Sequence, residues 1–385
     1  MGNYLKAIDY LEQTIAITRE IESKLEEGTA LRNLGGVYYS MGNYAKAIDY
    51  NEQSLVIART IKDCLGEADG LGNLGITYNS LGNHIKAIEF YEQSLAIARE
   101  IKAPLSEERS LGNLGLAYDS LGNYAKAIEF HKQSLAITRK IKNRAGEGRS
   151  LTMMGLAYYR SGKYAKAIEL HEQSLTIARE IKDYDGEGIA LGSLGIAYSA
   201  LNNYVKAIEF YEQSLAIARE IRDRSGERIA LNNIAAELKK QNQPDLAIVF
   251  YKQSVNVSES IRQNNRPLSR ELQASYTQTV VHTYRSLANL LIQQRRLPEA
   301  QAVLELLKLR ELRDFTRDTR AIDSPGISLA NIEKNALTEI LKSFSTIGNF
   351  SQQLSECEKT NCPTLTQLET QRDKLNNVIK EELKT

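Results

Sequence analysis

The sequence repeats itself with a period of 40 residues over most of its length. One string, Ala-Ile followed by an acidic residue, recurs at Ala7, Ala47, Ala87, Ala127, Ala167 and Ala207. A second string, Leu-Gly or Met-Gly with a tyrosine three residues after the glycine, stays in phase with it, at Leu34, Leu74, Leu114, Met154 and Leu194. Two strings that keep a constant offset predict an array of like units rather than one globular core.

Each period is predicted to be a pair of helices. Between residues 67 and 81, apolar and small residues recur at spacings of three and four, and they do so again between residues 85 and 102. Gly82 and Asn83 separate the two stretches and are typical of a helix end. The unit is therefore a helical hairpin. Because one hairpin cannot bury its apolar face alone, consecutive hairpins are expected to stack into a continuous core.

Small and charged residues at fixed places predict how the helices meet. Gly75 is expected to face Ala87 within its hairpin, so that the two axes approach to roughly the 8–10 Å of packed helices. The pair Gly66-Glu67 and its repeats are expected between units, with the glycine ending one helix and the glutamate favouring the start of the next. The Arg-Glu-Ile-Lys ends of the second helices, such as residues 99–102, are expected to form a solvated outer face with local ion pairs and no function.

Leucine, Leu-Gly and tyrosine on the first helix, with alanine and an aromatic residue on the second, resemble the tetratricopeptide repeat (TPR) signature over roughly residues 1–312. Two departures recur. The family's tryptophan is replaced by Leu31, Leu71, Leu111, Leu151, Leu191 and Leu231. A second small position is held by Ser54, Ser94, Ser134, Ser174 and Ser214. The long unit is similar to the repeats of kinesin light chains, of polarity adaptors and of bacterial arrays that precede CHAT-type caspase-like domains, all of which bind polypeptides.

The resemblance implies an all-α fold, a right-handed superhelical solenoid of TPR hairpins, followed here by a small helical C-terminal tail. We expect six units of about 40 residues in residues 1–262, the first lacking its first helix, a degenerate hairpin in residues 263–314, and a linker with a helical tail in residues 315–385. Residues 296–312 are similar to the junction before CHAT domains. The missing first helix predicts an exposed apolar amino-terminal end, which would suit a fragment or self-association.

In this family the first helices line the concave wall, so their residues that do not face the core are the candidate peptide-binding groove. An asparagine ladder there would bond an extended peptide backbone, since an amide both donates and accepts, although the amides could instead bond neighbouring helices. Gly72, Gly112 and Gly192 leave the wall flat, either for a ligand backbone or for tight helix packing. Arginines and tyrosines add a preference for an acidic partner. The candidate residues are Asn33, Asn73, Asn113, Asn233, Arg32, Arg109, Arg149, Arg160, Tyr39, Tyr159, Asn79 and Asp119.

Composition narrows the function further. Forty-nine basic and 48 acidic residues leave a formal net charge of +1, which argues against nucleic acid and anionic membranes as partners. Three cysteines are too few for a disulfide framework, and no apolar run is long enough to span a membrane, so we expect a cytoplasmic protein. Cys64 is expected to be a variable surface residue. Cys357 and Cys362 stand five apart, where a disulfide or half of a metal site is conceivable, but no further ligand lies near.

No catalytic role is expected, because the repeat distributes titratable groups evenly instead of gathering them. His84, His131 and His171 replace aromatic residues of other repeats and are expected to be packing residues, and no metal or cofactor is predicted. The predicted function is a scaffold that holds a protein or peptide partner in the groove. The alternative is a regulatory arm that restrains a CHAT caspase-like protease domain absent from this chain.

Overall fold

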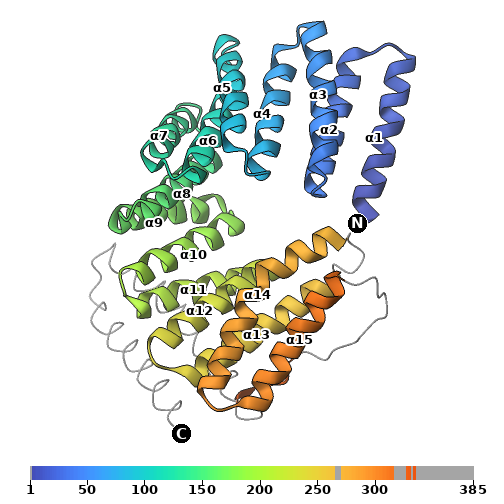
Figure 1. The fold of residues 1–385 in the computed structure, drawn as a ribbon. Coiled ribbons are helices and arrows are strands. Elements are labelled where there is room, and N and C mark those ends of the chain that lie inside the picture. Colours follow the sequence, from blue (N-terminus) through green and yellow to red (C-terminus); the bar gives the residue numbers. More distant parts are fainter. Residues whose placement is uncertain (1, 265–269, 316–326, 331–332, 335–385) are drawn as a thin grey trace. The chain divides into compact units, whose positions relative to one another are not determined.

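The computed structural model describes residues 2–264, 270–315, 327–330 and 333–334, and all of its regular structure in these residues is helical (Figure 1). The helices follow one another along the chain with short turns between them. They are α1 (Gly2–Glu20), α2 (Lys24–Ser40), α3 (Tyr44–Ile61), α4 (Cys64–Ser80), α5 (His84–Glu100), α6 (Pro104–Ser120), α7 (Tyr124–Lys140), α8 (Arg144–Arg160), α9 (Tyr164–Ile181), α10 (Tyr184–Ala200), α11 (Tyr204–Glu220), α12 (Arg224–Lys240), α13 (Pro244–Asn264), α14 (Arg270–Gln293) and α15 (Leu297–Phe315).

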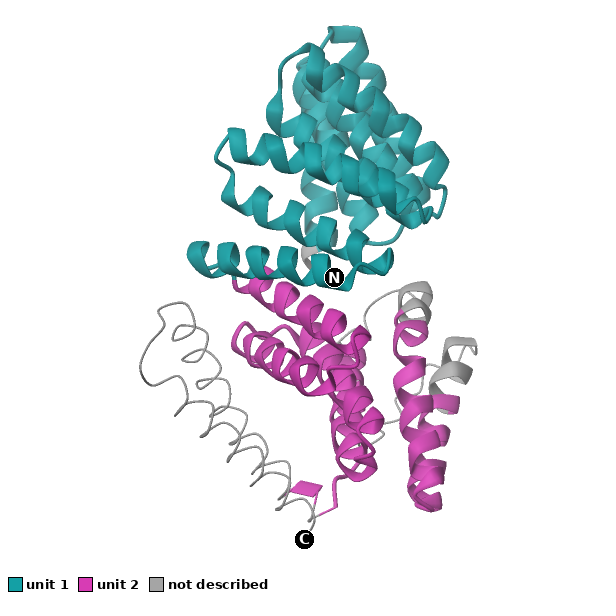
Figure 2. Cartoon of the chain, turned by 90° about the vertical axis from the view of Figure 1, so that its left-hand side faces the viewer, with its two compact units in different colours: residues 1–183 teal, residues 184–385 magenta. Residues whose placement is uncertain are grey.

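The chain divides into two compact units, residues 1–183 and residues 184–385, shown in different colours in Figure 2. Within each unit, helical hairpins follow one another as the period predicts, which confirms the all-α solenoid. Even-numbered helices are the first helices of the hairpins, and odd-numbered helices from α3 onward are their second helices. The predicted boundaries at residues 262 and 314 stay a prediction, and the predicted tail lies outside the described residues except for residues 327–330 and 333–334.

The described part of residues 1–262 contains one more unit than the sequence predicted. Helix α1 stands alone as a second helix, as expected, and six complete hairpins, from α2–α3 to α12–α13, follow it. The additional unit is α12–α13, in which Gln243 and Pro244 replace the usual Gly-Asn turn but Ala247 keeps the register and is fully buried. A seventh hairpin, α14–α15, ends the described array.

The core repeats with the sequence. The leucines that replace tryptophan are at most 1% exposed, which confirms that they belong to the core: Leu31, Leu71, Leu111, Leu151, Leu191 and Leu231. The serines at the second small position have a further role, because most of them donate a hydrogen bond to a first-helix carbonyl 26 residues earlier. The Ser94 hydroxyl, for example, lies 2.8 Å from the carbonyl oxygen of Ala68. Serine therefore recurs for its hydroxyl group as well as for its size.

In four hairpins the glycine of this string, at Gly75, Gly115, Gly155 and Gly195, packs against an aromatic ring and not against the alanine of the second helix, whereas Gly35 meets Asn51. A Cβ added to Gly75 would lie 2.5 Å from Cε1 of Tyr91, and one added to Gly115 would lie 2.4 Å from Cε1 of His131. The expected Gly75–Ala87 pairing was wrong because the second-helix residue one turn further along the chain, Tyr91, reaches back over the glycine. Glycine is therefore required at this position because any side chain would collide with the ring from the second helix.

The junction between hairpins also differs from the expectation. The second helices end at basic residues in the left-handed region, such as Lys62 at φ 57°, and not at the glycine of Gly66-Glu67. Gly66 lies in the first turn of α4, where its N–H bonds to the capping carboxylate of Asp63 and a Cβ would lie 2.2 Å from that carboxylate. Glycine is thus needed for the approach of the cap.

At most junctions between hairpins, an ion pair joins the two successive helices. The arginine near the end of a second helix contacts the glutamate in the first turn of the next helix, eight residues later, as in Arg139–Glu147 at 2.8 Å. Burial raises the pKa of Glu147, but hydrogen bonds from Arg139 and Arg144 outweigh it, so the pKa is lowered. The arginines remain partly exposed and form local ion pairs, as predicted, and these pairs join one hairpin to the next. The same pairing joins Arg19–Glu27, Arg59–Glu67, Arg99–Glu107 and Arg219–Glu227.

Candidate functional site

The first helices of consecutive hairpins lie side by side within each unit, and side-chain bonds cross from one to the next. We call this surface the first-helix wall; it consists of α2, α4, α6 and α8 in the first unit and of α10 and α12 in the second. The partners of most of these bonds are 40 or 41 residues apart, one repeat. The bonds are Tyr39–Ser80, Asp69–Arg109, Asp119–Arg160, Ser199–Glu237 and Ser199–Lys240.

Two arginines predicted to meet an acidic partner already have one. Arg109 Nη2 lies 2.5 Å from Asp69 Oδ1 of the preceding first helix, and Arg160 forms an ion pair with Asp119 in the same way. Burial raises the pKa of Asp119, and the charge and hydrogen bond of Arg160 only partly offset this rise. Asp119 Oδ1 is buried without a hydrogen-bond partner among the described residues. These pairs join neighbouring repeats, so their charges are largely compensated inside the wall.

The other two predicted arginines differ from this pattern. Arg149 is exposed in α8 and has no ion pair with another described residue, while Arg32 in α2 is half-buried. The predicted tyrosines pack against the next second helix. Tyr159 is tilted against Tyr164 with 5.4 Å between ring centroids, and Tyr39 against Tyr44 with 5.7 Å. Arg149 is thus the predicted cation that remains available to a partner.

The asparagine ladder is uneven. Asn33 is exposed, and Asn73, Asn113 and Asn233 are half-buried. Asn73 donates a hydrogen bond of 3.3 Å to Asn51 Oδ1, which fits the alternative that some amides bond to neighbouring helices. The side chains of Asn113 and Asn233 form no hydrogen bond with another described residue, so these amides are available.

Asn79 belongs to the hairpin rather than to an open surface, because its Oδ1 lies 2.7 Å from His84 Nδ1 of the next helix. The wall glycines are not explained by tight packing. A Cβ at Gly112 would meet nothing within 4 Å, and at Gly72 and Gly192 it would make only ordinary contact with a serine hydroxyl, at 3.8 and 3.7 Å. Glycine costs roughly 1 kcal/mol in a helix interior, so its recurrence here is unexplained by the fold alone.

A pocket of about 270 Å³ opens between α10 and α12, with α11 as its third side. Its wall contains three isoleucines that are unusually exposed for their size: Ile189 at 50%, Ile196 at 37% and Ile229 at 46%. Asn233 lies on the same pocket, and Gly188 and Gly192 leave room for it. The pocket therefore combines an apolar surface with an available amide, the usual composition of a side-chain-binding pocket.

A change of residue type along the first helices marks this pocket in the sequence. Among the first helices α2 to α12, only α10 has glycine at both of the repeat positions occupied by Gly188 and Gly192. The register of Ile189 and Ile229 is charged in three preceding repeats, where it holds Asp69, Arg109 and Arg149. The change from charged to apolar residues at this position marks the part of the first-helix wall where the surface becomes apolar.

In the described part of the chain, no group of three or more histidine, cysteine or carboxylate side chains is placed to hold a metal ion. His131 and His171 are each 1% exposed, which confirms them as packing residues, and burial lowers the pKa of both to about 4. Cys64 is exposed, as expected, and Cys357 and Cys362 lie outside the described residues. None of the described helices is long and apolar enough to cross a bilayer.

The family model named tetratricopeptide repeat matches residues 1–60, 66–140 and 146–220, which is more than half of the chain. The chain belongs to the tetratricopeptide repeat family. Among curated proteins, no significant match was found. The TPR assignment rests on the repeats themselves and accounts for the hairpins described above.

Solved structures with the same fold show how broadly TPR arrays are used. BtubC (BKLC) from P. vanneervenii is 19% identical, with a TM-score of 0.52 over 57% of this chain and 92% of that chain. A STAND signal-transduction ATPase with a TPR sensor, from Pyrococcus horikoshii, is 19% identical, with a TM-score of 0.58 over 89% of this chain and 47% of that chain. A Rap protein complexed with competence and sporulation factor is 15% identical, with a TM-score of 0.52 over 80% of this chain and 86% of that chain. At these identities the likeness establishes the fold alone.

Proposed function

We propose that this TPR protein is a non-catalytic scaffold that binds an extended segment of a partner protein on its first-helix wall. The α10–α12 pocket carries this proposal. It takes one apolar side chain of the partner, while Asn233 bonds the partner's backbone. An apolar pocket fixes an anchor residue, and an amide fixes the segment's direction without demanding a particular sequence.

The exposure of the pocket residues supports the proposal. Ile189, Ile196 and Ile229 lie on two adjacent helices and are between 37% and 50% exposed, so they form a contiguous apolar surface. Such surfaces on a folded protein mark interaction sites, and burying one further isoleucine-sized side chain against them contributes about 1.5–3 kcal/mol. That contribution suits one anchor of a segment held at several points.

Fewer arginines are available to bind an acidic partner than the sequence predicted. Arg109 and Arg160 are paired with Asp69 and Asp119, so replacing them is expected to disturb repeat packing more than binding. Arg149 is the cation we assign to a carboxylate of the partner. With its small number of cysteines, the chain suits a reducing compartment, and we place its function in the cytoplasm.

The related structures support the same mode of use. A Rap protein of the same fold has been solved in complex with competence and sporulation factor, so a TPR array of this kind holds another molecule. The alternative function, a regulatory arm, draws support from the Pyrococcus horikoshii ATPase, whose TPR portion is a sensor. A caspase-like effector domain such as CHAT in the same reading frame would favour the arm, and the wall would then bind the signal that it senses.

The pocket can be tested with one matched pair of variants. Gly192→Leu fills the pocket, and Gly112→Leu places the same side chain at the same register of α6, where nothing lies within 4 Å. Partners captured by the wild-type protein are identified by mass spectrometry, and their affinities are measured with purified components. We expect Gly192→Leu to weaken binding at least about tenfold and Gly112→Leu to weaken it less.

Loss with both variants would place the partner along the whole wall instead of in the pocket. Equal and undiminished binding by both would refute the proposal. Asn233→Ala supplies an independent check, because it removes the amide without filling the pocket, and it is expected to weaken binding of the same partners.

A further inference from the structure

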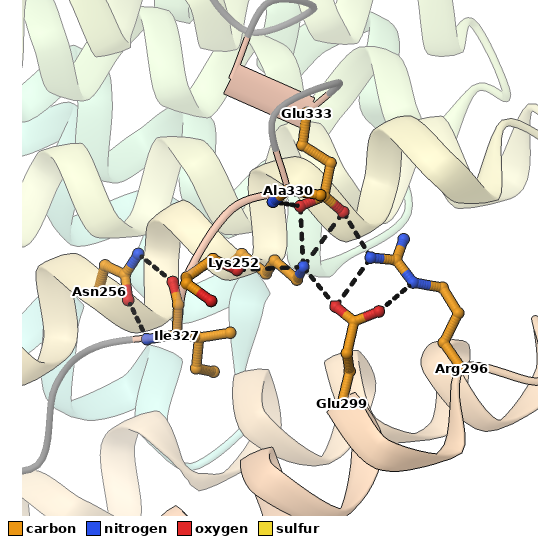
Figure 3. Close-up of polar contacts among 8 residues, drawn as sticks. Lys252, Asn256, Arg296, Glu299, Ile327, Ala330 and Glu333 are labelled. Carbon is orange, nitrogen blue, oxygen red and sulfur yellow. Dashed lines mark hydrogen bonds and ion pairs between the residues drawn. The ribbon is translucent and has the colours of Figure 1, made fainter.

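A segment near the end of the chain lies on the second helix α13 as a bound peptide would. Residues 327–330 and 333–334 meet α13 and the start of α15 (Figure 3). The Ile327 N–H donates to Asn256 Oδ1 at 2.9 Å, and Asn256 Nδ2 donates to the Ile327 carbonyl at 3.1 Å. One side-chain amide thus bonds both the N–H and the carbonyl of one residue. This backbone contact does not depend on the side chain that the residue carries.

Six residues later, the carboxylate of Glu333 enters a cluster of charges. Lys252 Nζ lies 2.8 Å from Glu333 and 2.6 Å from Glu299. Arg296 lies 2.7 Å from Glu333 and 2.6 Å from Glu299. Figure 3 shows the two cations and two carboxylates alternating around a ring, in which Lys252 is fully buried and Glu333 is 9% exposed. Burial raises the pKa of Glu333, but hydrogen bonds from Lys252 and Arg296 outweigh it and lower the pKa.

The same face is open to solvent on α5, α7 and α9, where Glu92, Lys132 and Glu172 hold the register of Lys252 and are exposed. On α11, one period before Lys252, the equivalent residue Glu212 is 9% exposed. The register of Asn256 holds Val56 in α3, which is 64% exposed. α13 therefore has a covered surface that α5, α7 and α9 leave exposed, and among the second helices α3 to α13 it alone combines an asparagine with a buried lysine there.

The charges explain what this surface requires. Lys252 of α13, Glu299 of α15 and Arg296, which immediately precedes α15, leave one positive charge in excess around a fully buried ammonium group. Glu299 alone balances one of the two cations, so a second carboxylate from elsewhere is needed to compensate the buried charge. Glu333 supplies it here.

We propose that α13 and the start of α15 form a second peptide-binding site, separate from the first-helix wall, that takes a segment with an apolar residue followed six residues later by a glutamate in a helical turn. Residues 327–330 and 333–334 belong to its ligand within the chain. Ile327 fits this description, because its side chain packs against the core of the second unit. Glu333 is prepared for the site by the Ala330 N–H, which donates to its Oε2 at 2.8 Å and fixes the carboxylate.

The tethered segment makes the site competitive. A ligand in the same chain is present at an effective concentration of the order of millimolar, so a partner segment of the same chemistry displaces it only if it binds more tightly or is abundant. The site thus couples capture of an acidic segment to release of the protein's own segment.

The test uses the full chain with Glu333→Gln, which keeps the shape of the side chain and removes its charge. Hydrogen exchange at residues 327–334 is expected to accelerate at least tenfold. A fluorescent peptide of residues 326–335 is expected to bind the Glu333→Gln chain at least tenfold more tightly than the wild-type chain, whose site is occupied. The same peptide with Gln in place of its glutamate should bind neither chain.

Glu169→Gln is the matched control, because Glu169 is 53% exposed and contacts Lys166 and Gln173 of its own helix at the surface of α9. It should change neither exchange nor peptide binding. If Glu333→Gln impairs folding, Asn256→Ala tests the backbone contact with all four charges intact, and exchange at the Ile327 amide must still rise. Unchanged exchange in both variants, or equal binding of the glutamate and glutamine peptides to the Glu333→Gln chain, would overturn the proposal.

Discussion

Arg160 in α8 neutralises Asp119 in α6, the first helix of the preceding repeat, across the first-helix wall. The carboxylate is 5% exposed and the guanidinium is 43% exposed, so losing the partner is more unfavourable for Asp119 than for Arg160. Arg160 can be solvated without Asp119, whereas Asp119 has no other counter-cation and one buried oxygen without a hydrogen bond among the described residues.

This asymmetry predicts effects of unequal size for the two conservative substitutions. Arg160→Gln is expected to lower the free energy of unfolding by about 1–3 kcal/mol, because it strands a buried carboxylate. Asp119→Asn is expected to change it by less than about 1 kcal/mol, and adding Asp119→Asn to Arg160→Gln should restore most of the loss. Urea denaturation at pH 7 measures all three variants. Equal losses from both single variants would contradict the asymmetry.

The pH dependence of the same pair has a defined sign. The pKa of Asp119 is raised in the folded state, so the folded protein holds this proton more firmly than the unfolded chain. Its contribution to stability is therefore greatest at low pH and is lost as the pH rises through the folded pKa. Asp119→Asn should gain on the wild type as the pH rises through the carboxyl range, which a series of thermal melts would show.

The buried histidines predict the opposite slope. Burial lowers the folded pKa of His131 and His171 from 6.5 to about 4, so the unfolded chain binds protons more readily between these values. Below pH 6.5 the free energy of unfolding is expected to fall by about 1.4 kcal/mol per pH unit for each histidine, until the folded groups titrate. Urea midpoints measured between pH 7 and pH 4 test this slope.

His131→Tyr with His171→Tyr should flatten that slope, because Tyr91 and Tyr211 fill the same register against Gly75 and Gly195. His282→Gln, at an exposed position of α14, is the control and should leave the slope unchanged. A slope that persists in the double variant would assign the acid sensitivity to other groups.

Two glycines one turn apart in α6 should respond oppositely to alanine. A Cβ at Gly115 would lie 2.4 Å from the His131 ring, so Gly115→Ala is expected to destabilise the protein by about 1–3 kcal/mol. A Cβ at Gly112 meets nothing within 4 Å, so Gly112→Ala is expected to stabilise by up to about 1 kcal/mol through helix propensity. Chemical denaturation of the two variants compares them directly, and losses of similar size would argue against the ring contact.

The hairpins, their core leucines and their register were predictable because they depend on contacts that repeat every 40 residues. The Gly75–Tyr91 packing was missed because spacing alone does not say which way a side chain leans. The Asp69–Arg109 pair lay within reach of the sequence, since the two residues hold one register in successive repeats. Lys252 and Glu333 are 81 residues apart and share no period, so nothing in the pattern joined them.

The exposed aromatic residue of α1 predicts concentration-dependent association. Equivalent rings, such as Phe90 and Phe130, stack on a first-helix tyrosine at centroid distances of 5.5 and 5.4 Å, but no ring from the described residues covers Tyr10, which is 67% exposed. We expect the apparent mass in light scattering to rise with protein concentration. Tyr10→Lys should suppress the rise, and Val56→Lys, at an equally exposed apolar position of α3, should not.

The contacts that join successive repeats span fixed distances along the chain, eight residues for the arginine–glutamate pairs and 26 for the serine–carbonyl bonds. Loss or duplication of one whole period by recombination within the gene would therefore recreate each of these bonds with a neighbour of the same kind. The length of such an array is free to change over evolution without a new folding solution. The hairpin of α10 is an exception, because no other hairpin from α2 to α13 combines glycine at both positions, Gly188 and Gly192, so a copy of another repeat would not restore the pair.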